Sequence, residues 1–257
     1  MCELFAMSSK FSTDVNLSLE EFSLHGGGTG PHSDGWGIAY AMDRDFRVIK
    51  EPEAAFDSDC VKYIESHKLA SHLVISHIRR ASPSKVVAFE NTHPFDREFF
   101  GRRLVFAHNG YIDQPESLLG EADRRWLPLG TTDSEAAFMV ILSRLAERID
   151  SYEAYHPRIV EEVLRELSPA LRERGKANFL LADQEYLFAH GDTSLFSLCR
   201  ACDLEEDQLA SDALRVLVSH GPGQDVALVA TNPLTESEPW VPFEPGEIRV
   251  FHEGRRI

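Results

Sequence analysis

The chain begins Met1-Cys2, so removal of Met1 would leave a thiol on the N-terminal residue. Such a cysteine carries a nucleophile and an amine on one residue. The free α-amine has a reference pKa of roughly 7.7–8.0 and can accept the thiol proton, directly or through a water, without a histidine. Residues 2–8 are mostly apolar and predict a buried strand. Alone, a cysteine at position 2 is most often a small residue that opens a strand, so a catalytic role depends on the groups that the fold brings to it.

Composition limits the class of protein. The chain has 257 residues and 43% apolar residues, which fits a globular protein of one large or two small domains. Its net charge of −16 disfavours nucleic acid and anionic membranes as partners. We find no apolar run near the ~20 residues that span a bilayer, and no secretory signal. These features predict a cytoplasmic protein without a membrane partner.

Cysteine and glycine patterns argue against two other kinds of site. Four cysteines are too few for a disulfide scaffold. Cys199 and Cys202 form a CxxC pair, but no second pair has zinc-site spacing, which favours two small apolar residues over redox or metal chemistry. The glycine-rich stretch 25–32 lacks the Gly-Lys-Ser/Thr of a phosphate-binding loop. We therefore expect no metal and no cofactor.

The hydrophobic pattern predicts strands, then helices, then strands again. Residues 33–40 are expected to be a turn that enters a strand. Other expected strands are 2–8, 46–50, 73–78, 103–108, 177–183, 185–190, 194–198, 214–219, 225–231 and 247–252. Expected helices are 16–23, 58–67, 133–149 and 157–174, the last closed by Gly175 as its C-cap. This order, without linkers or repeats, indicates an α+β layered fold over residues 1–257 as a single domain.

Four polar segments lie at predicted strand ends or helix starts: Cys2, 77–82, 107–110 and 131–135. Together they contain what cleavage of a terminal amide requires. Cys2 can supply the thiolate, and the side chain of Asn109 with the backbone N–H of Gly110 can stabilise an oxyanion. Arg79 offers a planar fork for an α-carboxylate, and Asp133 offers a carboxylate for an α-ammonium.

Each segment also has a simpler interpretation. Asn109-Gly110 alone is most often a hairpin turn, and Thr132-Asp133-Ser134-Glu135 alone is most often a helix cap. An arginine after a strand is usually a solvated charge. Because all four segments occur together and in this order, it is improbable that every one of these simpler interpretations holds.

The sequence resembles the class II glutamine amidotransferases, which are N-terminal-nucleophile hydrolases. The matching segments are Cys2, His77-Ile78-Arg79, His108-Asn109-Gly110, Thr132-Asp133-Ser134-Glu135, Asn91-Thr92-His93-Pro94 and Asp34-Gly35-Trp36-Gly37. The resemblance implies a four-layer αββα sandwich of two mainly antiparallel sheets. It also implies attack by Cys2 on a glutamine amide, an oxyanion hole at Asn109 and Gly110, and substrate binding by Arg79, Thr132 and Asp133.

Two departures refine this expectation. Some branches of the family have Trp after the arginine, whereas here Arg80 is followed by Ala81-Ser82-Pro83. We therefore expect Arg80 and Ser82 to line the substrate pocket, where a second cation favours a longer or more anionic ligand. No synthase domain follows before Ile257, so the chain is most similar to the stand-alone branch.

The leading interpretation is hydrolysis of a small γ-glutamyl amide through a γ-glutamyl thioester. One alternative is a glutaminase subunit that supplies ammonia to a separate synthase, and a homo-oligomer is equally open. A second is a non-catalytic binding module, in which a retained Met1 leaves Cys2 without its base. A papain-like Cys-His pair is disfavoured, because no cysteine has the usual flanking Gly-Ser pattern.

Overall fold

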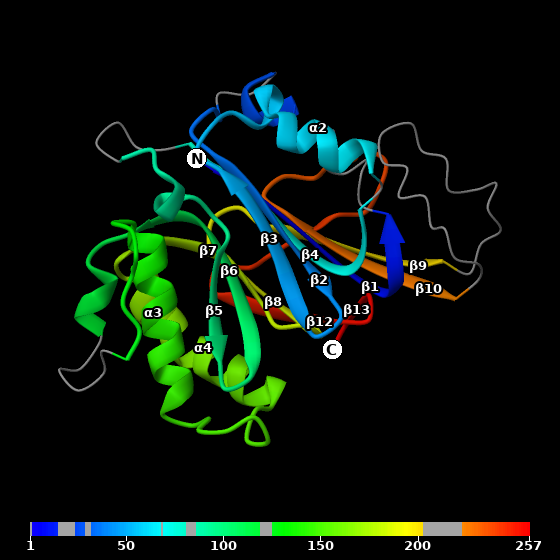
Figure 1. Ribbon diagram of the computed structural model, residues 1–257. Helices are drawn as coiled ribbons and strands as arrows, with labels where there is room; N and C mark the ends of the chain where they lie inside the picture. The colour runs from blue at the N-terminus through cyan, green and yellow to red at the C-terminus, as the bar shows by residue number, and fades with distance from the viewer. Residues whose placement is uncertain are drawn as a thin grey trace.

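The structure is a computed structural model that describes residues 2–14, 24–28, 32–67, 69–80, 86–118, 125–202 and 223–257. The predicted helix 16–23, the predicted strand 214–219 and the candidate pocket residue Ser82 lie outside these ranges. The two chain ends lie at opposite ends of the sheets (Figure 1).

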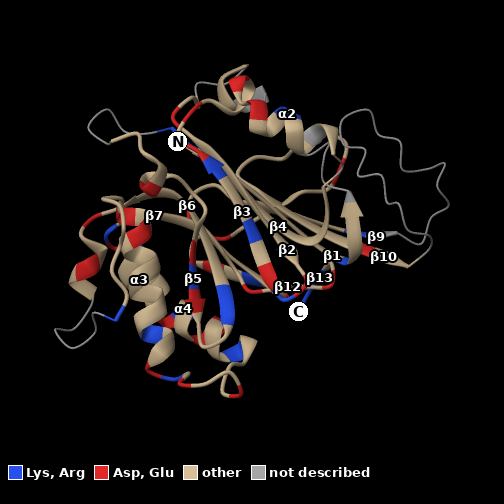
Figure 2. Ribbon diagram, viewed as in Figure 1, with Lys and Arg blue, Asp and Glu red and all other residues tan. Residues whose placement is uncertain are grey.

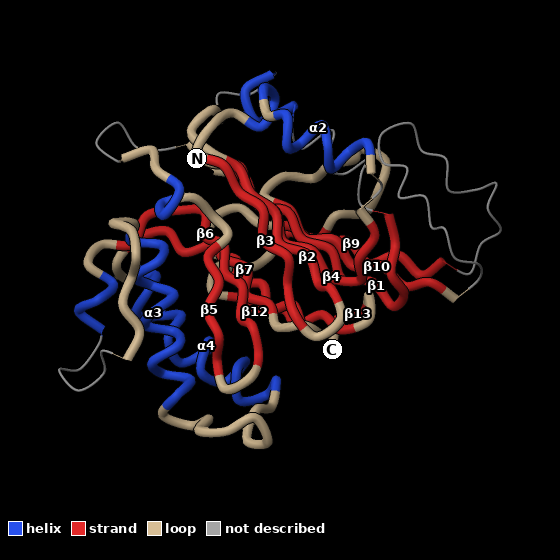
Figure 3. Tube along the Cα trace, viewed as in Figure 1, coloured by secondary structure: helices blue, strands red, loops and turns tan. Residues whose placement is uncertain are grey.

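Two sheets form the centre of the molecule, and all their paired strands are antiparallel (Figure 3). Sheet A has the order β11 (Val241–Pro242), β9 (Phe196–Cys202), β10 (Gln224–Ala230), β1 (Glu3–Asp14), β4 (Ala70–Ile78), β2 (Trp36–Met42) and β3 (Asp45–Glu51). Sheet B has the order β13 (Arg255–Arg256), β12 (Glu247–His252), β8 (Tyr186–Gly191), β7 (Gly175–Ala182), β6 (Arg102–Ile112) and β5 (Phe95–Phe99).

Helices cover the outer faces of these sheets. The helices are α2 (Asp59–Ser66), α3 (Asp133–Ala146) and α4 (Pro157–Arg172), with short turns η1 (Leu24–Gly28), η2 (Ala55–Asp57), η3 (Phe89–Asn91) and η4 (Pro115–Leu118). Helices α3 and α4 pack on sheet B, and α2 lies over sheet A (Figure 1). The layers are therefore helix, sheet, sheet and helix.

The side chains of β1 show how the sequence specifies these layers. Leu4 and Ala6 enter the core between the sheets, whereas Phe5 and Met7 pack with α2 on the outer face. Because successive strand residues point to opposite faces, a strand buried on both sides reads as a continuous apolar run. The central strand β4 carries no Lys, Arg, Asp or Glu, whereas the edge strand β3 carries both signs (Figure 2).

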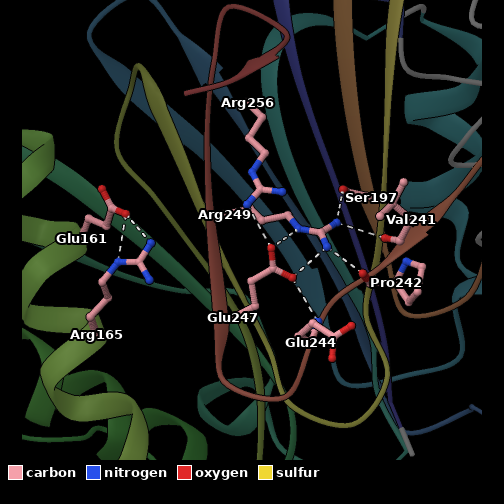
Figure 4. Close-up of polar contacts among 9 residues, drawn as sticks. All are labelled: Glu161, Arg165, Ser197, Val241, Pro242, Glu244, Glu247, Arg249 and Arg256. Carbon is pink, nitrogen blue, oxygen red and sulfur yellow. Dashed lines mark hydrogen bonds and ion pairs between the residues drawn. The ribbon is translucent and has the colours of Figure 1, made fainter.

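Arg249 of β12 joins sheet B to sheet A at their corresponding edges (Figure 4). Its Nη1 donates to Ser197 Oγ at 2.7 Å and to the Val241 carbonyl at 3.0 Å. Its Nη2 donates to the Pro242 carbonyl at 2.6 Å and to Glu247 Oε2 at 2.7 Å, and its Nε donates to Glu247 Oε1 at 2.9 Å. This buried guanidinium thus holds β9, β11 and β12 together.

Three sequence expectations differ from the structure. Strand β5 was not expected, and β1 runs to Asp14 rather than ending at residue 8. Gly175 is not the C-cap of α4: Glu173 has that place, and Gly175 begins β7 with a φ of 150°. A Cβ at Gly175 would meet the Tyr111 carbonyl oxygen at 1.9 Å, so close strand contact explains this glycine.

Candidate active site

The antiparallel pairing of β1 and β4 brings Cys2 to the segment that follows β4. Glu3 pairs with Ile78, so Cys2 lies opposite the start of that segment. The backbone N–H of Arg80 donates to Cys2 Sγ at 3.3 Å, and Sγ lies 3.6 Å from the Arg80 carbonyl oxygen. The structure therefore places the predicted nucleophile beside the arginine segment expected from the sequence.

The environment of Cys2 affects its protonation. Burial raises the pKa of the Cys2 thiol, and this effect exceeds the opposing effects of the Arg80 backbone N–H and the Arg79 charge. Asp133 also acts on the thiol and raises its pKa. Because electrostatic effects of this kind weaken with distance, Arg79 and Asp133 both lie in the neighbourhood of Cys2. A thiol with a raised pKa is protonated at neutral pH and needs a base before it can attack.

Arg79 is buried, with 4% of its surface exposed. Its Nη1 donates to the Asp34 carbonyl at 3.2 Å, and its Nη2 donates to the Val86 carbonyl at 3.2 Å. Its backbone N–H donates to the Gly35 carbonyl at 2.7 Å. The two side-chain contacts fix the guanidinium and, among the described residues, use only part of its donor set, which leaves donors for a carboxylate.

Thr132 and Asp133 form the start of α3. Thr132 is the N-cap, and its Oγ1 accepts the backbone N–H of Glu135 at 3.1 Å. Oδ2 of Asp133 accepts the backbone N–H of Ile112 at 2.9 Å, which ties the carboxylate to the end of β6. A carboxylate at a helix N-terminus is stabilised by the helix dipole. Asp133 therefore belongs both to the start of the capped helix and to the predicted ammonium site.

Asn109 and Gly110 lie within β6, which runs to Ile112, so the hairpin-turn interpretation is wrong. Asn109 is buried, and its Nδ2 lies 3.4 Å from Thr231 Oγ1. A Cβ at Gly110 would meet the Lys176 carbonyl oxygen at 1.9 Å, so the contact with β7 requires glycine.

His108 fixes the start of α3 against β6. Its Nε2 lies 3.0 Å from the Lys176 carbonyl oxygen, and its Nδ1 lies 2.9 Å from Ser134 Oγ. A carbonyl only accepts, so Nε2 carries the proton and Nδ1 accepts the Ser134 hydroxyl. Burial lowers the pKa of His108, consistent with this neutral ring.

Asn91 links the two ends of the predicted substrate site. Its Nδ2 donates at 3.2 Å to the Val86 carbonyl that also accepts from Arg79, and its Oδ1 accepts the backbone N–H of Thr131 at 2.8 Å. The Asn91-Thr92-His93-Pro94 segment matches a family motif, but the sequence indicated no role for Asn91.

Arg80 and Ser82 are the remaining residues predicted to line the substrate pocket. Arg80 contacts the thiol through its main chain, while its side chain is exposed. The structure does not describe Ser82. Thr231 and Asn178 were missed: the Asn178 Nδ2 donates to the Asn109 carbonyl at 3.2 Å, and neither residue lies in a motif that would have identified it.

In the described ranges, no cluster of three or more His, Cys, Asp or Glu could hold a metal ion. No helix among them is long and apolar enough to cross a membrane. Cys199 is an exposed free thiol.

Comparison with known proteins identifies the family. A family model described as "Glutamine amidotransferases class-II" matches residues 1–257. The chain belongs to the class II glutamine amidotransferases. Membership implies hydrolysis of a glutamine amide with donation of ammonia, and it confirms the resemblance seen in the motifs.

Individual relatives agree with this assignment. "Putative glutamine amidotransferase YafJ" of Escherichia coli K12 is 36% identical over 265 residues, covering 100% of both chains. "Uncharacterized protein MJ1515" of Methanocaldococcus jannaschii is 34% identical over 271 residues, covering 100% of this chain and 71% of that one.

Solved structures confirm the fold. A crystal structure described as a predicted glutamine amidotransferase from Pseudomonas aeruginosa has a TM-score of 0.73 at 31% identity, covering 100% of this chain and 99% of that one. The phosphoribosylpyrophosphate amidotransferase of B. subtilis has a TM-score of 0.66 at 15% identity, covering 100% of this chain and 48% of that one, which shows the fold alone. The expected sandwich of two antiparallel sheets is therefore confirmed.

Proposed function

We propose that this amidotransferase, after removal of Met1, hydrolyses a small γ-glutamyl amide through a thioester on Cys2. The observation that carries the proposal is the contact of the Cys2 sulfur with the Arg80 backbone N–H at 3.3 Å, next to the buried Arg79. The charge of Asp133 also acts on this thiol. An arginine and a carboxylate beside one nucleophile match the α-carboxylate and α-ammonium of a glutamyl group.

The proposed reaction has two steps. The α-amine of processed Cys2 takes the thiol proton, and the sulfur attacks the γ-carbonyl carbon. Asn109 and the Gly110 N–H stabilise the oxyanion, and the C–N bond breaks as the leaving amine takes a proton. Water then attacks the thioester, which releases a γ-carboxylate and restores the thiol. Because burial raises the pKa of Cys2, the thiol needs a base within reach, and in this scheme the α-amine of the same residue is that base.

A second candidate is ammonia supply to a separate synthase, favoured by the class to which the chain belongs. It uses the same residues and differs only in the fate of ammonia. Under this proposal a synthase partner binds near the site, whereas under the first a small γ-glutamyl molecule is the sole partner. Neither uses a metal, a nucleic acid or a membrane.

The test is a screen of glutamine and other γ-glutamyl amides against the processed protein, with glutamate release as the measurement. Cys2→Ala should abolish turnover. Cys60→Ala is the matched control, because Cys60 is a partly buried free cysteine on α2 and should retain activity. Turnover by Cys2→Ala, or none by the processed wild type, would contradict the proposal. Turnover that appears only with a co-purified partner would favour ammonia supply.

A further inference from the structure

Thr231, which follows β10, is attached to the strand that carries the nucleophile. Its Oγ1 accepts the backbone N–H of Leu4 at 2.9 Å, and its own N–H donates to the Leu4 carbonyl at 3.0 Å. Ser194 Oγ donates to the Thr231 carbonyl at 2.9 Å, and the residue is 5% exposed. Thr231 is thus fixed to Leu4, which lies two residues along the chain from Cys2.

The same hydroxyl approaches the amide of Asn109 on the other sheet. Thr231 Oγ1 lies 3.4 Å from Asn109 Nδ2, a long distance for a hydrogen bond. Oδ1 of Asn109 is buried and has no hydrogen-bond partner among the described residues. A buried amide oxygen without a partner is costly, so this arrangement leaves the Asn109 side chain unsatisfied.

The protons on Leu4 and Thr231 favour the opposite orientation of the Asn109 side-chain amide. The Leu4 N–H can only donate, so Thr231 Oγ1 accepts there and keeps its own proton to donate. An amide oxygen is an acceptor for that proton, and the two ends of an amide are nearly equal in size. A half-turn of the Asn109 amide places its oxygen on Thr231 and its nitrogen where the unsatisfied oxygen now lies.

The Asn109 backbone does not need to move for this turn. It is paired with Asn178 on β7, and the Asn178 Nδ2 donates to the Asn109 carbonyl at 3.2 Å. Only the side-chain amide has two orientations, and the Thr231 hydroxyl distinguishes between them.

We propose that Thr231 is a positioning residue that donates to the Asn109 amide oxygen and so directs the amide nitrogen toward the substrate carbonyl. The inference rests on the proposed function, because it assigns Asn109 to the oxyanion. It makes Thr231 the link between the strand of the nucleophile, β1, and the strand of the oxyanion donor, β6.

The prediction concerns rate rather than substrate binding. Removing an oxyanion donor typically lowers kcat by about 10²–10³. Thr231→Val keeps the shape but removes the hydroxyl, and we expect kcat for glutamine to fall by about 10- to 100-fold with KM changed less than about threefold. Thr231→Ser restores the hydroxyl and should recover most of the rate. Glutamate affinity, measured by calorimetry, should stay within about threefold, because Arg79 and Asp133 are untouched.

A double-mutant cycle tests whether Thr231 acts through Asn109. In an Asn109→Ala background, Thr231→Val should lower kcat less than threefold further. Thr235→Val is the matched control, since Thr235 is a buried threonine whose hydroxyl binds Glu238 and Trp240 away from the site, and its kcat should be unchanged. If Thr231→Val does not fold, comparison of Thr231→Ser with Thr231→Ala answers the same question.

The outcomes separate this inference from the proposed function. Wild-type turnover with an unchanged kcat in Thr231→Val, or an equal loss in the Asn109→Ala background, overturns the inference alone. A rise in KM in place of a fall in kcat overturns it as well. Failure of the processed wild type to hydrolyse any γ-glutamyl amide overturns the proposed function and the inference with it.

Discussion

The sulfur of Cys2 accepts the backbone N–H of Arg80 at 3.3 Å. The two residues are 78 positions apart, and the antiparallel register of β1 on β4 brings them together. The contact opposes part of the effect of burial on the Cys2 pKa and holds the thiol beside Arg79. The position of the nucleophile therefore depends on strand pairing rather than on a local motif.

Asp133→Asn should weaken binding of the substrate ammonium. The amide can still accept the Ile112 N–H, so α3 stays in place while the negative charge is lost. We expect KM for glutamine to rise by about 10- to 100-fold, or about 1.4–2.7 kcal/mol. Steady-state kinetics measures this. Asp113→Asn, which changes an acid bound to exposed Tyr111, is the control, and equal KM values in all three proteins would refute the role of Asp133.

Gly110→Ala should disturb the pairing of β6 with β7. The added Cβ would meet the Lys176 carbonyl oxygen at 1.9 Å, so the strands must separate. We expect a loss of about 2–3 kcal/mol in unfolding free energy, measured by urea denaturation. Tyr111→Phe on the same strand should change stability by less than about 0.5 kcal/mol. Equal stability of the two variants would show that β6 accommodates a side chain at this position.

Arg249→Lys should destabilise the joined sheet edges. An ammonium cannot reproduce the planar fork that binds Ser197, Val241, Pro242 and Glu247 (Figure 4). We expect a loss of about 2–4 kcal/mol, since the buried pair is left incomplete. The control is Arg165→Lys, because Arg165 forms an exposed i,i+4 pair with Glu161 whose contribution is below about 0.5 kcal/mol. Similar urea midpoints for the two variants would contradict this role of Arg249.

His77 should make stability depend on pH. Its ring is buried and stacks on His93 with centroids 4.1 Å apart, and burial lowers the pKa of His77 to about 3. An unfolded histidine titrates near pH 6.5. The contribution of neutral His77 to the free energy of unfolding is therefore complete above about pH 6.5, and it is lost as pH falls from 6.5 toward 3.

The variant His77→Phe keeps a stacked ring that cannot be protonated. Its unfolding free energy should fall less steeply than that of the wild type between pH 6.5 and 4, as measured by urea denaturation at each pH. Parallel curves for the two proteins would show that His77 does not contribute to acid sensitivity.

Local sequence patterns predicted much of the fold. The apolar residues of α3 and the apolar runs of β1 and β4 identify these elements, because burial dictates their residues. Strand β5 was missed because Asp96, Arg97 and Glu98 occupy the middle of a five-residue edge strand, where one side is solvated. Gly175 was misassigned because its glycine requirement comes from Tyr111, which is distant in sequence.

In the candidate site, too, some residues can be predicted from local sequence, whereas others depend on contacts between distant segments. Cys2, Arg79 and Asp133 lie in short motifs with direct chemical interpretations, so sequence alone could propose them. The contact of Thr231 with Leu4 joins residues 227 positions apart, and a threonine after an apolar strand has no distinctive pattern. Such positioning residues become visible only when the strands are paired.

The mass of the N-terminal peptide after reaction with a glutamine-like diazoketone tests the central claim most directly. The proposed mechanism predicts a peptide that begins at Cys2 and carries one adduct on its sulfur, with glutamate protecting against modification. A peptide that retains Met1, or an unmodified Cys2 in protein lacking Met1, would contradict it.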